Sequence, residues 1–127
     1  MRASLPILVC LMATPLPAHA DTVPAGDATR GKGVYEDYCG ACHSIDQNRV
    51  GPAHRGVYGR KPGKAPGYSY SANMTKQKFV WNDVMLDKWL TNPQELIPGA
   101  RMGFRLGDPQ KRADVIAYLK TQAAPKK

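Results

Sequence analysis

The chain has 127 residues, a formal net charge of +8 and 43% hydrophobic residues. This length allows one compact domain with a small core and is too short for two domains of ordinary size. The basic charge of a chain with an export signal favours contact with acidic protein surfaces over binding to nucleic acid.

Residues 1–20 have the three parts of a secretory signal peptide. Arg2 supplies the positive start, the run from Leu5 to Leu16 is apolar but too short to span a bilayer, and Ala18-His19-Ala20 is a small-x-small cleavage site. We therefore expect export to the periplasm and a mature domain of residues 21–127 without stable membrane insertion.

The first predicted helix runs from Ala28 to about Cys39, with Asp27 as its N-cap. Val34, Tyr35 and Tyr38 fall on one side of this helix and predict a buried stripe. The helix would end at the chain's most informative motif.

This motif is Cys39-Gly40-Ala41-Cys42-His43, whose C-x-x-C-H spacing is typical of covalent c-type haem attachment. Two cysteines three apart can reach both vinyl groups of one porphyrin, and the next residue turns its imidazole onto the iron. A zinc site would need four ligands, and a thioredoxin-type dithiol would follow a strand. Cys10 would leave with the signal peptide, so the motif predicts one haem c per chain, held by Cys39 and Cys42.

The stretch from Ile45 to Asn73 is rich in glycine and proline and has little apolar periodicity. We interpret it as a long ordered loop that wraps a haem edge. Within it, Pro52 has a free carbonyl and no N–H, so it is a candidate acceptor for the second ring N–H of His43. An ordinary turn proline is the alternative interpretation.

Three helical segments are predicted in the second half. Asn82 caps a helix that ends at about Thr91, Pro93 to about Leu96 forms a short turn, and Asp108 caps a last helix that ends near Gln122. Their expected buried residues are Val84, Met85, Leu86, Trp89, Leu90, Ala113, Ile116, Ala117, Tyr118 and Leu119.

The second axial ligand has several candidates. Met102 lies in a loop bounded by proline and glycine, far enough along the chain to approach the opposite haem face. Met85 is more simply core filling, and Met74 lies in a polar segment. His54 is the rival ligand, and a bis-histidine iron would have a lower reduction potential than one bound by a thioether.

Further segments have an order and spacing found together in one family. They are Cys39–His43, Gly51-Pro52, Gly56–Lys61, Ala65–Ser71, Trp81, Asn92-Pro93, Ile97–Gly99 with Met102, and Ile116–Lys120. Between Gly26 and Leu119 the chain resembles class I cytochrome c of the mitochondrial type and its bacterial periplasmic relatives. The resemblance implies an all-α fold, with about three main helices and long loops wrapped around one covalent haem.

The resemblance also implies residue roles. Cys39 and Cys42 would carry the thioethers, His43 and Met102 would bind the iron, and the Pro52 carbonyl would accept the His43 N–H.

A second group of implied roles concerns the rest of the haem. Arg60, Tyr70 and Trp81 match residues that hydrogen-bond or neutralise a buried propionate, and Phe104 matches an aromatic residue beside the exposed haem edge.

Four positions depart from the mitochondrial pattern. Trp89 replaces a tyrosine near the methionine sulfur, and Ala100 replaces a threonine that serves a propionate. Met74 stands at a position often held by asparagine, and His54 at one where a leucine packs near the haem. These departures concern the fine tuning of the reduction potential and not the ligation of the iron.

The implied function is one-electron transfer between larger redox complexes by a monomeric periplasmic carrier that is not an enzyme. The expected donor is a cytochrome bc complex, and the expected acceptor is an oxidase or a photosynthetic reaction centre. Five cations are expected to form a basic docking ring for acidic surfaces, with plain solvated surface as the alternative. They are Arg49, Lys64, Lys88, Arg101 and Arg105.

The alternative function is a five-coordinate haem that binds gas or performs peroxidase chemistry. Four-helix gas-binding c-type proteins carry the motif near the C-terminus, whereas here it lies near the N-terminus.

Overall fold

The computed structural model describes residues 24–124, so the predicted signal peptide lies outside the described residues. Within this range the regular structure is helical and contains no strand. No helix in it is long and apolar enough to cross a membrane. The helices are α1 (Ala28–Tyr38), α2 (Ala72–Thr75), α3 (Asp83–Thr91), α4 (Pro93–Leu96) and α5 (Pro109–Thr121).

Three predicted helix starts are confirmed. The side chains of Asp27, Asn82 and Asp108 each accept a hydrogen bond from a backbone N–H two or three residues further on. Such a cap contributes about 1 kcal/mol, because it satisfies a donor that the first helical turn leaves free.

Other details differ from the expectation. The predicted loop ends early, because the Ser71 hydroxyl caps α2, whose four residues are too few to give a periodic pattern. Val84 and Tyr38 were expected to be buried but are 60% and 40% exposed, while Val115, which was not predicted, is only 1% exposed.

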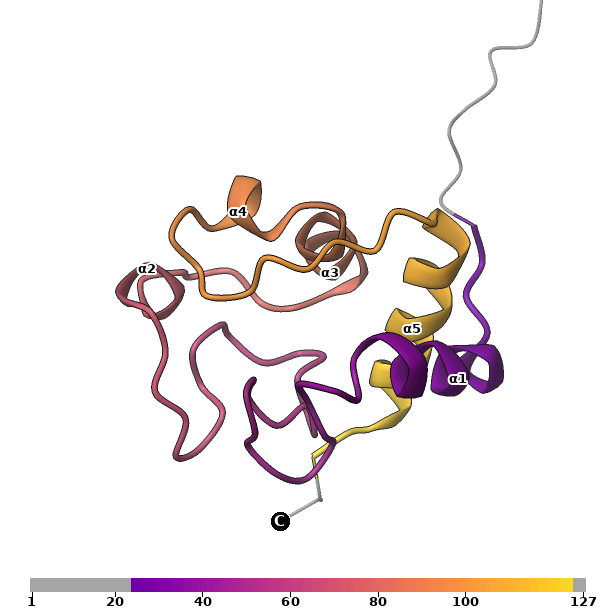
Figure 1. The fold of residues 1–127 in the computed structure, drawn as a ribbon, viewed down its shortest axis with the longest axis horizontal. Coiled ribbons are helices and arrows are strands. Elements are labelled where there is room, and N and C mark those ends of the chain that lie inside the picture. The colour runs from indigo at the N-terminus through magenta and orange to yellow at the C-terminus, as the bar shows by residue number, and fades with distance from the viewer. Residues whose placement is uncertain (1–23, 125–127) are drawn as a thin grey trace, which may run out of the picture.

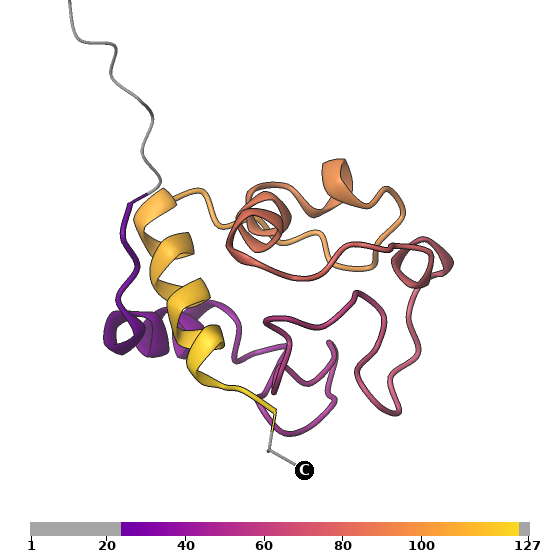
Figure 2. The ribbon, with the colours of Figure 1, turned by 180° about the vertical axis from the view of Figure 1, so that it is seen from behind.

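Figures 1 and 2 show α1 and α5 packed together at one end of the molecule. Two glycines permit this close approach. A Cβ on Gly31 would overlap the backbone carbonyl of Asp114, and one on Gly26 would overlap that of Ala113. The backbones therefore touch where other residues would hold them apart.

The same crossing contains an ion pair between a buried carboxylate and an arginine that is more than half exposed. Asp114 is 3% exposed, and its carboxylate accepts hydrogen bonds from Arg30 Nε and Nη2, both at 2.8 Å. It also accepts from the backbone N–H of Asp27 at 2.8 Å and from Gln110 Nε2 at 3.0 Å. These donors, chiefly Arg30, lower the pKa of Asp114 to about 2.

The α3 helix is joined to α5 by a second ion pair. Arg112 Nε donates to Asp87 at 2.7 Å, and Arg112 Nη1 donates to the carbonyls of Leu106 and Gly107. The segment before α5 is thereby fixed against α3. The long loop after α1 forms the other side of the molecule, opposite α3 and α4 (Figure 1).

Candidate functional site

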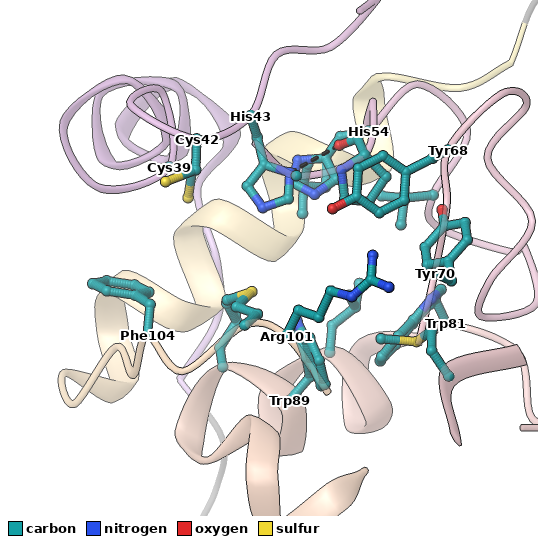
Figure 3. Close-up of a pocket in the computed structure, with 18 of the residues that line it drawn as sticks. Cys39, Cys42, His43, His54, Tyr68, Tyr70, Trp81, Trp89, Arg101 and Phe104 are labelled. Atoms are coloured by element: carbon teal, nitrogen blue, oxygen red, sulfur yellow. Dashed lines mark hydrogen bonds between the residues drawn. The ribbon is translucent and has the colours of Figure 1, made fainter. Parts of the chain in front are cut away.

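A cavity of about 610 Å³ lies between the loop after α1 and the segment that carries α3 and α4. This volume lies within the range of sites that hold a small molecule or a cofactor. Figure 3 shows Cys39, Cys42 and His43 at one end of the cavity and Tyr70 and Trp81 at the other. All the residues predicted to bind the cofactor line it: Cys39, Cys42, His43, Pro52, Arg60, Tyr70, Trp81, Met102 and Phe104.

The two thiols lie just beyond the end of α1. Cys39 is the C-cap of the helix and half-buried, whereas Cys42 is exposed, and both are free. Burial, together with the nearby Cys42, raises the pKa of Cys39 to about 11. A thioredoxin-type nucleophile needs a lowered thiol pKa, so the environment of Cys39 disfavours dithiol redox chemistry.

The His43 ring is held in one tautomer. Its Nδ1 donates to the Pro52 carbonyl at 2.8 Å, which leaves Nε2 with its lone pair free. Burial lowers the pKa of His43 despite this hydrogen bond, which favours the neutral form that binds metals. The ring packs so closely on Gly51 that a Cβ there would overlap it.

Met102 reaches the cavity from the segment between α4 and α5. Gln94 braces this segment: its Nε2 donates to the carbonyls of Ala100 at 2.6 Å and Met102 at 3.0 Å, and its Oε1 accepts from the Gly99 N–H at 3.1 Å. Sequence reasoning missed Gln94, because an exposed glutamine one residue after a helix-initiating proline carries no distinctive signal.

The charged side chains that line the cavity are positive. Arg60, Lys61 and Arg101 line it, and within the described part of the chain no Asp or Glu does so. Cations without carboxylate partners suit a ligand that carries negative charge.

The residues expected to serve a propionate lie together. Arg60 donates to the carbonyls of Arg55 and Ala53, and its backbone carbonyl accepts from the Trp81 N–H at 2.9 Å. The Tyr70 hydroxyl accepts from the Ala65 N–H at 3.1 Å. Burial lowers the pKa of Arg60 and raises that of Tyr70, as expected for groups at a partly dry wall.

Of the expected docking cations, two have other contacts. Arg101 Nη1 donates to the Ser69 carbonyl at 2.6 Å, and Figure 3 shows its guanidinium pointing into the cavity. Arg49 Nη1 donates to the Gly40 carbonyl at 2.6 Å. Like Arg49 and Arg101, the other three, Lys64, Lys88 and Arg105, are exposed.

The aromatic residue expected at the haem edge lies at the surface. Phe104 is 41% exposed, and its ring centroid lies 6.5 Å from that of Tyr38, the residue before Cys39. The segment that carries Met102 therefore passes close to the end of the cavity where the thiols lie.

The departures from the family pattern lie at or beside the cavity. Met74 and Trp89 line it, Trp89 with its ring 5.5 Å from that of Trp81, and Ala100 is buried next to the segment that carries Met102. His54 stacks on His43 with ring centroids 4.0 Å apart, so this imidazole is placed in the cavity wall.

These residues fit a covalent haem. The cavity has two free thiols in the C-x-x-C-H arrangement of haem attachment, an imidazole with a free Nε2, a thioether from a different segment, and cations for the carboxylates. The apolar area supplied by tryptophans and leucines suits the porphyrin face.

Known proteins resemble the chain in sequence and structure. A family model described as Cytochrome c matches residues 28–123. Cytochrome c2 of Rhodopila globiformis is 44% identical over 103 residues, which is 79% of this chain and 97% of that protein. Cytochrome c of Euglena viridis is 46% identical over 99 residues, covering 76% of this chain and 97% of that protein.

Among solved structures, cytochrome cH from Methylobacterium extorquens superposes with a TM-score of 0.72 at 41% identity. The match covers 76% of this chain and 99% of the other. The helical order, the described cavity and these similarities agree, and the predicted family and fold are confirmed. The chain belongs to the cytochrome c family, as a bacterial class I member.

Proposed function

We propose that this protein is a periplasmic one-electron carrier, not an enzyme, with one six-coordinate haem c bound through His43 and Met102. The observation that carries the proposal is the cavity itself, into which two chain segments bring an imidazole with a free Nε2 and a thioether. With both axial positions filled by side chains, no substrate would reach the iron.

Bound haem would supply the Fe(III)/Fe(II) couple, and the chain's residues would set how readily it is reduced. Cys39 and Cys42 would hold it through thioethers. The Pro52 carbonyl, by accepting the Nδ1–H of His43, fixes the tautomer of the ring and raises the basicity of Nε2. The Met102 thioether would favour the reduced state and raise the potential.

The polar end of the cavity would bind the propionates. Arg60, Tyr70 and Trp81 lie there together, and a guanidinium bound to a carboxylate forms strong, charge-assisted hydrogen bonds. These residues would hold the haem by its carboxylates, and Phe104 would cover its exposed edge.

The position of His54 supports Met102 as the second ligand. The rings of His54 and His43 lie face to face, 4.0 Å apart and tilted by 19°. Two imidazoles on opposite sides of an iron point their nitrogen atoms at each other and do not stack, because each metal to nitrogen bond is about 2 Å long. His54 therefore lies on the same side as His43.

The other methionines are weaker candidates. Met85 does not line the cavity, and Met74 lies on α2, whose Asn73 donates to the Pro98 carbonyl. Only the Met102 segment combines the brace from Gln94 with a position near the thiols.

A ferric spectrum tests this ligation. We expect a near-infrared sulfur-to-iron charge-transfer band, which Met102→Ala abolishes and the control variants Met74→Leu and Met85→Leu retain. Absence of the band in the unaltered holoprotein, with rapid binding of cyanide or carbon monoxide, would instead identify a five-coordinate haem with gas-binding or peroxidase activity.

The proposed partners are larger redox complexes with acidic docking surfaces. A cytochrome bc complex is the proposed donor, an oxidase or a photosynthetic reaction centre the proposed acceptor, and the carrier is proposed to act as a monomer. The exposed Lys64, Lys88 and Arg105 support electrostatic docking. Electron transfer between carrier and partner should slow as ionic strength rises, and a flat dependence would contradict steering by these cations.

A further inference from the structure

A hydrogen-bonded pair of side chains lies against His43. The Tyr35 hydroxyl and Nδ1 of His54 are 2.9 Å apart, and the His54 ring stacks on His43 with a centroid distance of 4.0 Å. Tyr35 comes from α1 and is 5% exposed, whereas His54 comes from the loop after the haem-binding motif. Figure 3 shows His54 beside His43 in the cavity wall.

The contacts on His43 come from different directions. The Pro52 carbonyl holds its Nδ1 edge at 2.8 Å, and the backbone of Gly51 packs against the ring. These contacts hold one edge of the ring, but a hydrogen bond tolerates a range of angles, so the ring can still rotate through a limited arc about its Cβ–Cγ bond. The stacked face of His54 opposes this rotation.

We propose that His54 is a positioning residue for His43: its stacked imidazole, itself held by the Tyr35 hydroxyl, fixes the orientation of the iron ligand's ring. This inference rests on the proposed ligand role of His43.

The pair is itself well anchored. The His54 backbone N–H donates to the Ser44 carbonyl at 3.1 Å, and its carbonyl accepts from the Val57 N–H at 2.9 Å. The Tyr35 ring packs against Tyr118 of α5, with centroids 5.4 Å apart. Both members of the pair are thus anchored by contacts that do not involve His43.

The hydrogen-bonded pair of Tyr35 and His54 is not what simple packing against the His43 ring requires. The resemblance implies a leucine at position 54, and a branched aliphatic side chain fills volume without favouring one orientation of a neighbouring ring. A flat ring favours one orientation of a ring stacked on it. Burying the two polar groups costs free energy, which the hydrogen bond between them offsets. The geometry thus supports a role in orientation.

The test is paramagnetic NMR of the ferric holoprotein, in which the shifts of the His43 ring protons report the orientation of the ring relative to the haem. We expect His54→Leu and Tyr35→Phe each to displace these signals. In the double variant, Tyr35→Phe should add nothing, because its effect passes through His54. Tyr68→Phe is the matched control: it removes another phenol hydrogen bond of the cavity wall, to the Val50 carbonyl, and should leave the signals in place.

Unchanged His43 signals in either single variant would overturn the inference, as would additive effects in the double variant. Tyr35→Phe removes one oxygen atom only, so it decides the question even where His54→Leu does not fold. The sulfur-to-iron band, recorded on the same samples, reports Met102 separately. If the His43 signals do not move in the variants and the band is intact, only the positioning role of His54 is refuted. If the His43 protons of the unaltered protein show no paramagnetic shifts, both the ligand role of His43 and the positioning role of His54 are refuted.

Discussion

The α1–α5 crossing and the cavity wall use opposite kinds of construction. At the crossing, the buried charge has its partners within the chain: the carboxylate of Asp114 accepts four hydrogen bonds, and its main partner is Arg30. Along the cavity, Arg60, Lys61 and Arg101 face a space without a carboxylate from the described part of the chain. The comparison indicates that the buried charge of the crossing is satisfied within the chain, whereas the cations of the wall suit an anionic group bound in the cavity.

The largest expected effect is at the crossing. Gly31→Ala places a Cβ on the backbone carbonyl of Asp114, which cannot move without separating the two helices. We expect a loss of about 3 kcal/mol or more in the free energy of unfolding, measured by chemical denaturation of the holoprotein. Gly33→Ala, two residues along α1, meets nothing within 4 Å and should stabilise the helix by up to about 1 kcal/mol. Equal effects of the two variants would contradict a close backbone contact.

The next effect concerns the buried carboxylate. Asp114→Asn removes the charge that Arg30 faces, and we expect a loss of about 1–2 kcal/mol, reduced because Arg30 is more than half exposed. Asp46→Asn is the control, since its ion pair with Arg55 lies at the surface and should contribute little.

Acid should produce the same loss. The pKa of Asp114 is lowered in the folded chain to about 2, so its contribution is present above the unfolded pKa of about 4 and disappears as the pH falls from 4 to 2. The free energy of unfolding, measured between pH 5 and pH 2, should therefore fall less steeply for Asp114→Asn than for the unaltered protein. Parallel curves would contradict this assignment.

The same two regions differ in how far the sequence predicted them. Capping residues and the C-x-x-C-H motif act within a few positions of the chain, so the caps Asp27, Asn82 and Asp108 and the position of the motif in the cavity wall could be predicted from local patterns. Gly31 packs against the backbone of Asp114, more than eighty residues away. In the sequence it is only a residue of low helix propensity.

The contacts that join distant segments were likewise not predictable. The family pattern put His54 at a position where a leucine packs near the haem, but nothing in the sequence linked His54 to Tyr35, because that hydrogen bond depends on where the long loop passes α1. The brace from Gln94 and the inward direction of Arg101 also depend on how two loops approach each other.

A smaller effect is expected on the wall at Gln94. Gln94→Leu removes three hydrogen bonds that hold the segment from Gly99 to Met102 and should weaken ligation by Met102 by about 1–2 kcal/mol. The measurement is the affinity of imidazole for the ferric protein, which should rise about tenfold as it displaces the methionine more easily. Glu95→Gln, an adjacent change on the exposed side of α4, should leave the affinity unaltered.

The smallest effect separates cations that line the cavity from cations that face a partner. Arg101 contacts Ser69 and points into the cavity, so Arg101→Gln should lower the reduction potential, because a nearby positive charge stabilises the ferrous state. Lys88 is exposed on α3, so Lys88→Gln should leave the potential nearly constant and reduce the salt dependence of electron transfer to the partner. Arg101 would belong to the docking ring after all if its variant altered the salt dependence and left the potential unmoved. The reduction potential and the salt dependence of electron transfer therefore assign each cation to the cavity wall or to the docking surface. A solvated charge at the surface acts on association with the partner and only weakly on the iron.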